Sequence, residues 1–127
     1  MNINELRINN LISHNGLICT VEIINGELNE IYFLGEEFYH SDKPENLEGV
    51  PLTEEVLLKS GFVYTDDVVN LNRNYKLQEF EIQLHLDVND FICCNTIPNY
   101  IQIKYVHTLQ NLYFDFTNEE LASTKAN

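Results

Sequence analysis

The sequence has few positive charges, and they are not clustered. Seven Lys and Arg stand against twenty Asp and Glu in 127 residues, which gives a formal net charge of −13. Proteins that bind nucleic acid use Lys and Arg to replace the counterions of the phosphates, and an acidic surface is repelled by anionic membranes. The composition therefore argues against direct binding to nucleic acid or membrane, and it predicts a well-solvated acidic protein.

Long apolar runs are also missing. The sequence has no stretch of 18 apolar residues, which a membrane-spanning helix would need, and its opening MNINELRINN lacks the basic and apolar regions of a secretion signal. Cys19, Cys93 and Cys94 are an odd number of cysteines without the spacing of a disulfide framework. We therefore expect a cytoplasmic protein with reduced thiols.

Motifs of catalysis are absent as well. The sequence contains no Gly-rich phosphate loop, no G-x-S-x-G and no H-E-x-x-H. Carboxylates are abundant, but most stand in segments that are typical of loops and helix caps, where solvation explains them. The sequence favours a non-enzyme that carries no cofactor.

What is present predicts a single α+β domain over residues 1–127. Residues 3–39 contain short apolar runs separated by Asn15-Gly16 and Asn25-Gly26, and Asn-Gly between apolar runs is a strong hairpin signal. This pattern predicts an antiparallel β-meander that curls like a small barrel. The polar segment GEEFYHSDKPENLEGVP that follows predicts a loop, because it is rich in turn residues and has no period.

A short helix is predicted over residues 53–60. Thr53 is a suitable N-cap, and Gly61 is placed for the left-handed position after the helix. Residues 61–105 are predicted to form strands. The clearest is LQEFEIQLHLDV, in which apolar side chains up to Leu86 alternate with polar ones up to Asp87. DFICCN and YIQIKYV are expected to be its neighbours, joined by a turn over residues 95–99.

The C-terminal part, residues 106–122, is predicted to be helical and to pack on the sheet. Its apolar side chains fall at helical spacing, and Val106, Leu109, Leu112 and Tyr113 form the expected buried stripe. The segment 117–120, Thr-Asn-Glu-Glu, reads as a capping box for one more short turn of helix.

Three segments carry a resemblance to a known family. ELRINNLISHNGLICTVEII, GVPLTEEVLLKSGF and IKYVHTLQNLYFDFTNEEL together resemble small uncharacterised proteins encoded by phages and prophages of Bacteroidota, and the third segment, with its Tyr-Val-His-x-Leu-Gln-Asn-Leu-Tyr signature, is the most specific. Asn9 and Asn118 stand where that family usually has glycine. The resemblance implies a phage or mobile-element origin and a bacterial cytoplasm, and it carries no activity and no catalytic residues.

The candidate contact residues surround the C-terminal helix. His107 and Gln110 stand three residues apart on one flank, where they could hydrogen-bond a strand edge, a partner or a ligand. Tyr105 and Tyr113 could supply aromatic contacts, and Arg7 and Lys104 could neutralise a phosphate. Because most aromatic side chains must be core, the favoured interpretation is a helix that simply closes the fold.

A metal site is a weaker hypothesis. His85 and Asp87 are expected on one polar strand face, and His107 would have to join them to give three ligands. Nothing in the sequence brings His107 to that face. Satisfied or exposed histidines are therefore the favoured interpretation.

The leading functional hypothesis is a non-catalytic phage or prophage accessory module that binds a host or defence protein through an acidic surface with exposed tyrosines. One alternative is a binder or sequestering protein for a small nucleotide-like ligand. A second is an acidic decoy that occupies the nucleic-acid-binding surface of another protein. A third is a small metal-dependent hydrolase.

Overall fold

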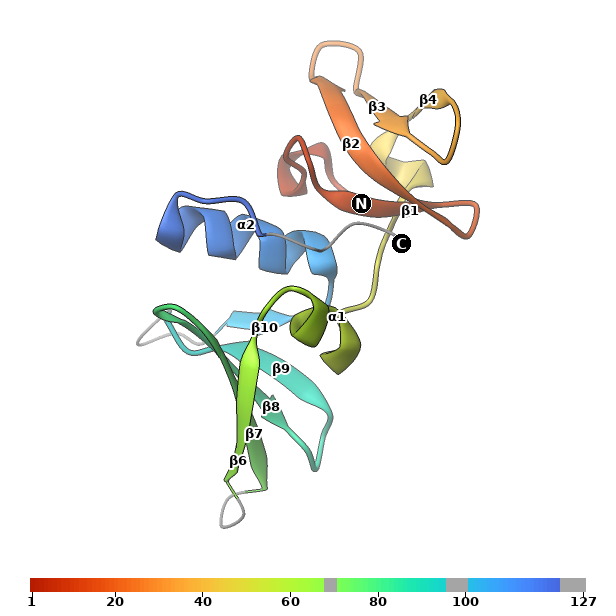
Figure 1. The fold of residues 1–127 in the computed structure, drawn as a ribbon. Helices are drawn as coiled ribbons and strands as arrows, with labels where there is room; N and C mark the ends of the chain where they lie inside the picture. The colour runs from red at the N-terminus through yellow and green to blue at the C-terminus, as the bar shows by residue number, and fades with distance from the viewer. Residues whose placement is uncertain (68–70, 96–100, 122–127) are drawn as a thin grey trace.

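The computed structural model describes residues 1–67, 71–95 and 101–121. The chain forms two five-stranded antiparallel sheets, two α-helices and two short 3-10 turns (Figure 1). In chain order the elements are η1 (Ile3–Glu5), β1 (Leu11–His14), β2 (Leu17–Asn25), β3 (Glu30–Leu34), β4 (Tyr39–Asp42), η2 (Pro44–Asn46), β5 (Glu48–Gly49), α1 (Glu54–Lys59), β6 (Val63–Asp67), β7 (Asn72–Leu77), β8 (Phe80–His85), β9 (Asp90–Cys93), β10 (Ile101–Ile103) and α2 (Val106–Thr117). The α+β class predicted from the sequence is confirmed.

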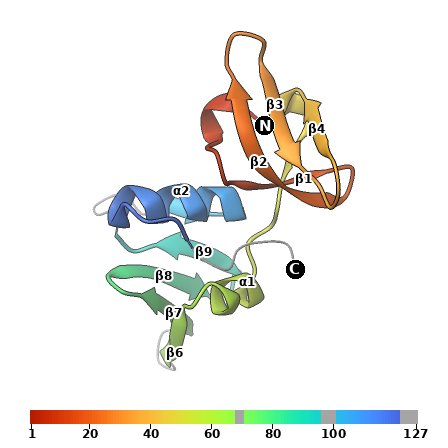
Figure 2. The same ribbon diagram turned by 45° about the horizontal axis from the view of Figure 1, so that its top comes forward.

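The N-terminal sheet has the linear order β4-β3-β2-β1-β5 (Figure 2). Its two edges, β4 and β5, are separate, and no pairing among the described residues closes the sheet. The prediction of a curled, barrel-like meander is therefore wrong. The segment 35–51, predicted to be a loop, supplies both edge strands as well as η2.

The first predicted hairpin forms as expected, because Asn15 and Gly16 both have positive φ angles of 51° and 83°. The second turn is longer than predicted. β2 runs to Asn25, and the left-handed residue of this turn is Asn29, with a φ of 52°, rather than Gly26.

The C-terminal sheet has the order β10-β9-β8-β7-β6, and α1 and α2 lie on one side of it (Figure 1). The predicted alternation holds along β8, where Phe80, Ile82 and Leu84 are buried. β9 and β10 pair beside β8 as predicted, and most of the turn predicted over residues 95–99 lies outside the described residues. Leu86 departs from the pattern, because the strand ends at His85 and Leu86 is 42% exposed.

Both helices end at left-handed residues. Thr53 caps α1 by accepting a hydrogen bond from the Val56 N–H, and Gly61 follows the helix with a φ of 99°, as predicted. α2 ends at Asn118, which has a φ of 60°. The predicted further helical turn does not form up to Leu121. The Thr117 hydroxyl does accept a hydrogen bond from the Glu119 N–H, but the residues that follow are not helical.

Each sheet has its own hydrophobic core. The larger core joins the C-terminal sheet with α1 and α2, and it also receives Leu11 from β1. The smaller core lies between the N-terminal sheet and the short segments near η1 and η2, where Leu6 and Leu47 are buried. α2 thus packs on the C-terminal sheet, as predicted, and contacts the N-terminal sheet at β1. Among the described helices, none is long and apolar enough to cross a membrane.

Candidate functional site

Gln110 joins α2 to the N-terminal sheet. Its side chain is 3% exposed. The side-chain carbonyl accepts a hydrogen bond from the Leu11 N–H at 2.9 Å, and the side-chain NH₂ donates to the Asn9 C=O at 3.1 Å. Gln110 therefore satisfies two backbone groups next to β1, which is the strand-edge contact that the sequence allowed for this residue.

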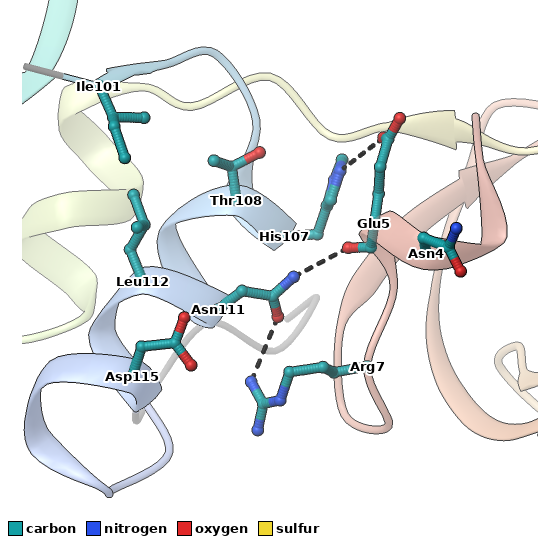
Figure 3. A pocket seen from close by; sticks show the side chains of 9 residues that line it. All are labelled: Asn4, Glu5, Arg7, Ile101, His107, Thr108, Asn111, Leu112 and Asp115. Carbon is teal, nitrogen blue, oxygen red and sulfur yellow. Dashed lines mark hydrogen bonds and ion pairs between the residues drawn. The ribbon is translucent and has the colours of Figure 1, made fainter. Parts of the chain in front are cut away.

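Asn111 and Arg7 extend this polar contact (Figure 3). The Asn111 NH₂ donates to the Glu5 C=O at 2.8 Å, and its carbonyl accepts from the Arg7 guanidinium at 3.2 Å. Arg7 also forms an ion pair with Glu120 at 2.6 Å and lies over the Phe114 ring. The charge of Arg7 is thus used within the protein, where it links the N-terminal segment to α2 and to the segment that follows α2.

His107 lies at the start of α2 and is 2% exposed. Its Nε2 is 3.6 Å from a Glu5 carboxylate oxygen, and the Tyr105 ring stacks on the imidazole at a centroid distance of 5.6 Å. Its Nδ1 has no hydrogen-bond partner among the described residues. Burial lowers the pKa of His107 below its ordinary value, although the Glu5 carboxylate acts in the opposite direction. His107 is therefore a buried residue of the junction between the sheets.

Gly49 makes this arrangement possible. The segment after β5 pairs with the segment before α2, through the Leu52 N–H to the Lys104 C=O and the Val106 N–H to the Val50 C=O. At Gly49, a Cβ would lie 2.5 Å from the Tyr105 ring. Only glycine lets the backbone of β5 approach the stacked Tyr105 and His107 this closely.

Two hollows flank the junction. One, of about 470 Å³, is lined by residues that include Glu5, Arg7, His107 and Asp115 (Figure 3). The other, of about 560 Å³, includes Glu5, Glu48, Tyr105 and His107. Neither combines a tyrosine with a lysine or arginine, and each has two carboxylates. An anionic ligand such as a phosphate would therefore meet repulsion in either hollow.

The remaining predicted contact residues are placed differently. Tyr113 is buried in the larger core, where its ring lies 5.5 Å from that of Phe80. Lys104 is exposed and lines neither hollow. Tyr105 is partly exposed above His107. The structure thus brings His107, Tyr105, Arg7 and Gln110 to one junction, and leaves Tyr113 and Lys104 outside it.

The three weak metal candidates do not converge. The His85 ring hydrogen-bonds the Gln83 side chain at 2.7 Å. Both side chains lie on the outer face of the sheet, because Leu84 between them points into the core. Asp87 is exposed in the turn after β8, and His107 lies at the sheet junction. No group of three His, Cys, Asp or Glu among the described residues is arranged to hold a metal ion.

A different surface stands out on the N-terminal sheet. Ile12 and Phe33 point into the smaller core, so side chains that alternate with them point outward. The outward set includes Ile18, Ile23 and Tyr39, which are 42%, 57% and 70% exposed, and the half-buried Tyr32 and Leu34 between them. Tyr32 is paired with Ile23, and Leu34 with Tyr39. We call the surface formed by Ile18, Ile23, Tyr32, Leu34 and Tyr39 the open face.

Acidic side chains border the open face. Glu22 lies at a bulge in β2 beside Ile23. Glu30 accepts a hydrogen bond from the Tyr32 hydroxyl and raises the pKa of that phenol through its negative charge. Glu36 and Glu37 are exposed in the turn between β3 and β4. The open face is therefore apolar in the centre and negative at its rim.

The sequence patterns predicted a curled meander over residues 3–39 and did not identify Ile18 or Ile23 as exposed. A signal was present in β2, LICTVEIIN, which is apolar on both sides of the strand rather than alternating.

Comparison of the chain with models of protein families, with curated proteins and with solved structures finds no match in any of the three.

Proposed function

We propose that this protein is a non-catalytic binding module and that its open face is the site where a partner protein docks. The observation that carries the proposal is the exposure of Ile18, Ile23 and Tyr39 on one sheet face. Contiguous exposed apolar side chains on a folded protein mark interaction sites, and a centre of tyrosine and isoleucine with a polar rim is typical of a protein interface.

The resemblance of the sequence to phage and prophage proteins of Bacteroidota supports a more specific form of the proposal. The module would then be an accessory protein of a phage or prophage that acts in the bacterial cytoplasm on a host or defence component. The partner would have a complementary basic rim, because the rim of the open face is acidic.

The other hypotheses draw less support from the geometry. A decoy of nucleic acid needs a continuous negative surface, whereas the open face has an apolar centre. A nucleotide-like ligand needs a positively charged side chain beside an aromatic ring in one hollow. Arg7 is paired with Glu120, however, and both hollows carry carboxylates. A metal-dependent hydrolase would need His85, Asp87 and His107 close enough together to bind one metal ion, and these three side chains lie apart.

The test is affinity capture from a bacterial host with the intact chain as bait and mass spectrometry of the retained proteins. Ile23→Glu places a charge in the centre of the open face, and Gln102→Glu adds the same charge to the exposed side of β10 as a matched control. We expect a specific partner to be retained by the wild type and the Gln102→Glu variant and lost from the Ile23→Glu variant. A partner held equally by all three would contradict the proposal.

Salt dependence separates this proposal from the decoy. Binding that depends on buried apolar area, with an acidic rim that adds steering, should weaken modestly between 50 and 500 mM salt. A decoy should lose most of its affinity over that range, because its contacts are ion pairs that salt screens.

A further inference from the structure

The edge strand β4 borders the open face and is unpaired on its outer side among the described residues. It is the last strand in the order β4-β3-β2-β1-β5, and Tyr39, His40 and Ser41 are all exposed. Figure 2 shows β4 at the border of the N-terminal sheet. An edge strand presents free N–H and C=O groups that can pair with another chain.

The other sheet edges offer less. β5 has two residues and β10 has three. β6 has five residues, but it ends in Asp66-Asp67, and Asp66 forms an ion pair with Arg73. Charged residues on an edge are one of the ways in which proteins prevent unwanted pairing. β6 also carries the exposed Val63 and Tyr64, but β4 is the edge that borders the open face.

The hydrogen-bond pattern shows which backbone groups of β4 are free. The Gly35 N–H donates to the Phe38 C=O, in the same register in which Leu34 is paired with Tyr39. Hydrogen-bonded and non-hydrogen-bonded pairs alternate along an antiparallel ladder. His40 and Asp42 therefore direct their backbone groups toward β3, and Tyr39 and Ser41 direct theirs outward.

The side chains around β4 indicate which segment would fit. A strand beside β4 would continue the open face next to Tyr39, which favours apolar or aromatic side chains at every second position. Glu36 and Glu37 lie in the turn that leads into β4, and Lys43 is the one lysine or arginine in the segment 36–43. This charge favours Lys or Arg in the added strand.

We propose that the partner of this protein docks through an extended segment, alternately apolar and carrying Lys or Arg, which adds to β4 as a sixth strand of the N-terminal sheet. This rests on the proposed function, since it names how the partner of the open face is held. Main-chain hydrogen bonds to Tyr39 and Ser41 would supply part of the affinity, and side-chain contacts on the open face would supply specificity.

The test uses a displayed library of random 12-residue peptides, panned against the intact chain, followed by synthesis of enriched peptides. Ser41→Pro removes an outward N–H and blocks pairing, and it leaves the bonds to β3 in place, because proline is tolerated at edge positions whose N–H faces solvent. Ser41→Thr retains the N–H and is the matched control. Circular dichroism checks that both variants fold.

We expect enriched peptides to alternate apolar residues with Lys or Arg, and to lose at least tenfold in affinity with Ser41→Pro and less than twofold with Ser41→Thr. Amide hydrogen exchange on the wild type gives a second measurement that does not depend on a variant. The amide protons of Tyr39 and Ser41 should become protected when the peptide binds, whereas those of β6 should not change.

The outcomes separate this inference from the proposed function. If binding of the peptides or of a captured partner is lost with Ile23→Glu but unchanged with Ser41→Pro, strand addition is overturned and the open face remains the binding site. Enrichment of no peptide, or no added protection at Tyr39 and Ser41, would also overturn strand addition. Binding that ignores both Ile23→Glu and Ser41→Pro would overturn both proposals.

Discussion

The two sheets have the same number of strands and the same antiparallel pairing, but their second faces differ. The C-terminal sheet buries one face under α1 and α2, and its other face carries polar side chains such as Asn74 and Gln83, which hydrogen-bond each other. The N-terminal sheet buries one face against the short segments near η1 and η2, and its other face is the open face. Only the C-terminal sheet follows the usual division into a packed face and a solvated face.

The difference shows where the fold leaves an apolar sheet face uncovered. A sheet that is apolar on both faces needs a second layer to cover it. α2 supplies one for the C-terminal sheet but reaches the N-terminal sheet at its β1 and β5 end, where Leu11 enters the larger core and Gly49 lies beside His107. The strands beyond β1 keep their outward Ile23 and Tyr39 exposed. Under the proposed function, a partner protein would supply the layer that covers these side chains.

The largest expected effect compares one side chain on each sheet. Leu84→Ala should lower the free energy of unfolding by about 3 kcal/mol, because Leu84 is fully buried and its loss leaves a cavity. Ile23→Thr keeps a β-branched side chain at an exposed position, so it should change the stability by less than about 0.5 kcal/mol. Urea denaturation of both variants measures the difference. A large cost for Ile23→Thr would mean that the open face is covered in the free protein.

A smaller effect tests the junction that holds the sheets together. Gly49→Ala should destabilise the protein by about 2 kcal/mol, because the added Cβ would lie 2.5 Å from the Tyr105 ring and force the stacked rings to move. Gly26→Ala is the matched control, since no atom lies within 4 Å of a Cβ there. Thermal denaturation gives both values. Equal stability of the two variants would show that Tyr105 does not pack on β5 as described.

The pH dependence of stability addresses the same junction. His107 is buried with a lowered pKa, mainly because burial penalises the charged imidazole, although Glu5 opposes this and the chain's N-terminal amine adds to it. The unfolded chain takes up a proton at an ordinary pKa of about 6.5, so stability should fall as the pH drops below that value, until the pH passes the folded pKa.

The measurement is urea denaturation at pH 7.5 and pH 5.5 for the wild type and for His107→Gln, which cannot titrate. We expect the wild type to lose more stability than the variant between these two pH values. Asp42 and Glu54, whose pKa values are lowered by hydrogen bonds to Asn46 and Tyr75, lose their contribution only at more acidic pH. The same loss in both proteins would show that His107 is not the group responsible.

Local patterns in the sequence predicted much of the fold, because they depend on neighbouring residues. The alternation in β8, the cap at Thr53 and the turn at Asn15-Gly16 are of this kind. β4 was missed because YHSD has no alternation of apolar and polar residues, and pairing with β3 rather than side-chain burial makes it a strand. The contacts of the junction were also not predicted, because they join residues that are distant in sequence, such as Arg7 and Asn111, which are 104 residues apart.

The candidate site was predicted less well for the same physical reason. His107 and Gln110 were identified as a polar pair on α2, and the contact of Gln110 with a strand edge was one of the stated possibilities. That both are buried depends on where the N-terminal segment docks, which no local pattern encodes. The open face was equally hidden, since the exposure of Ile23 follows from how far α2 extends over the sheet.

The smallest expected effect concerns the end of α2, the helix that covers one sheet and stops short of the other. Asn118 has a φ of 60°, a conformation that costs little for asparagine and nothing for glycine. Asn118→Gly should therefore change the stability by a few tenths of a kcal/mol, and Asn118→Ala should lower it by about 1 kcal/mol. Val88→Ala, at an exposed site outside the strands, is a control for a general effect of substitution. If Asn118→Ala were as stable as Asn118→Gly, the chain would not leave α2 in the left-handed conformation.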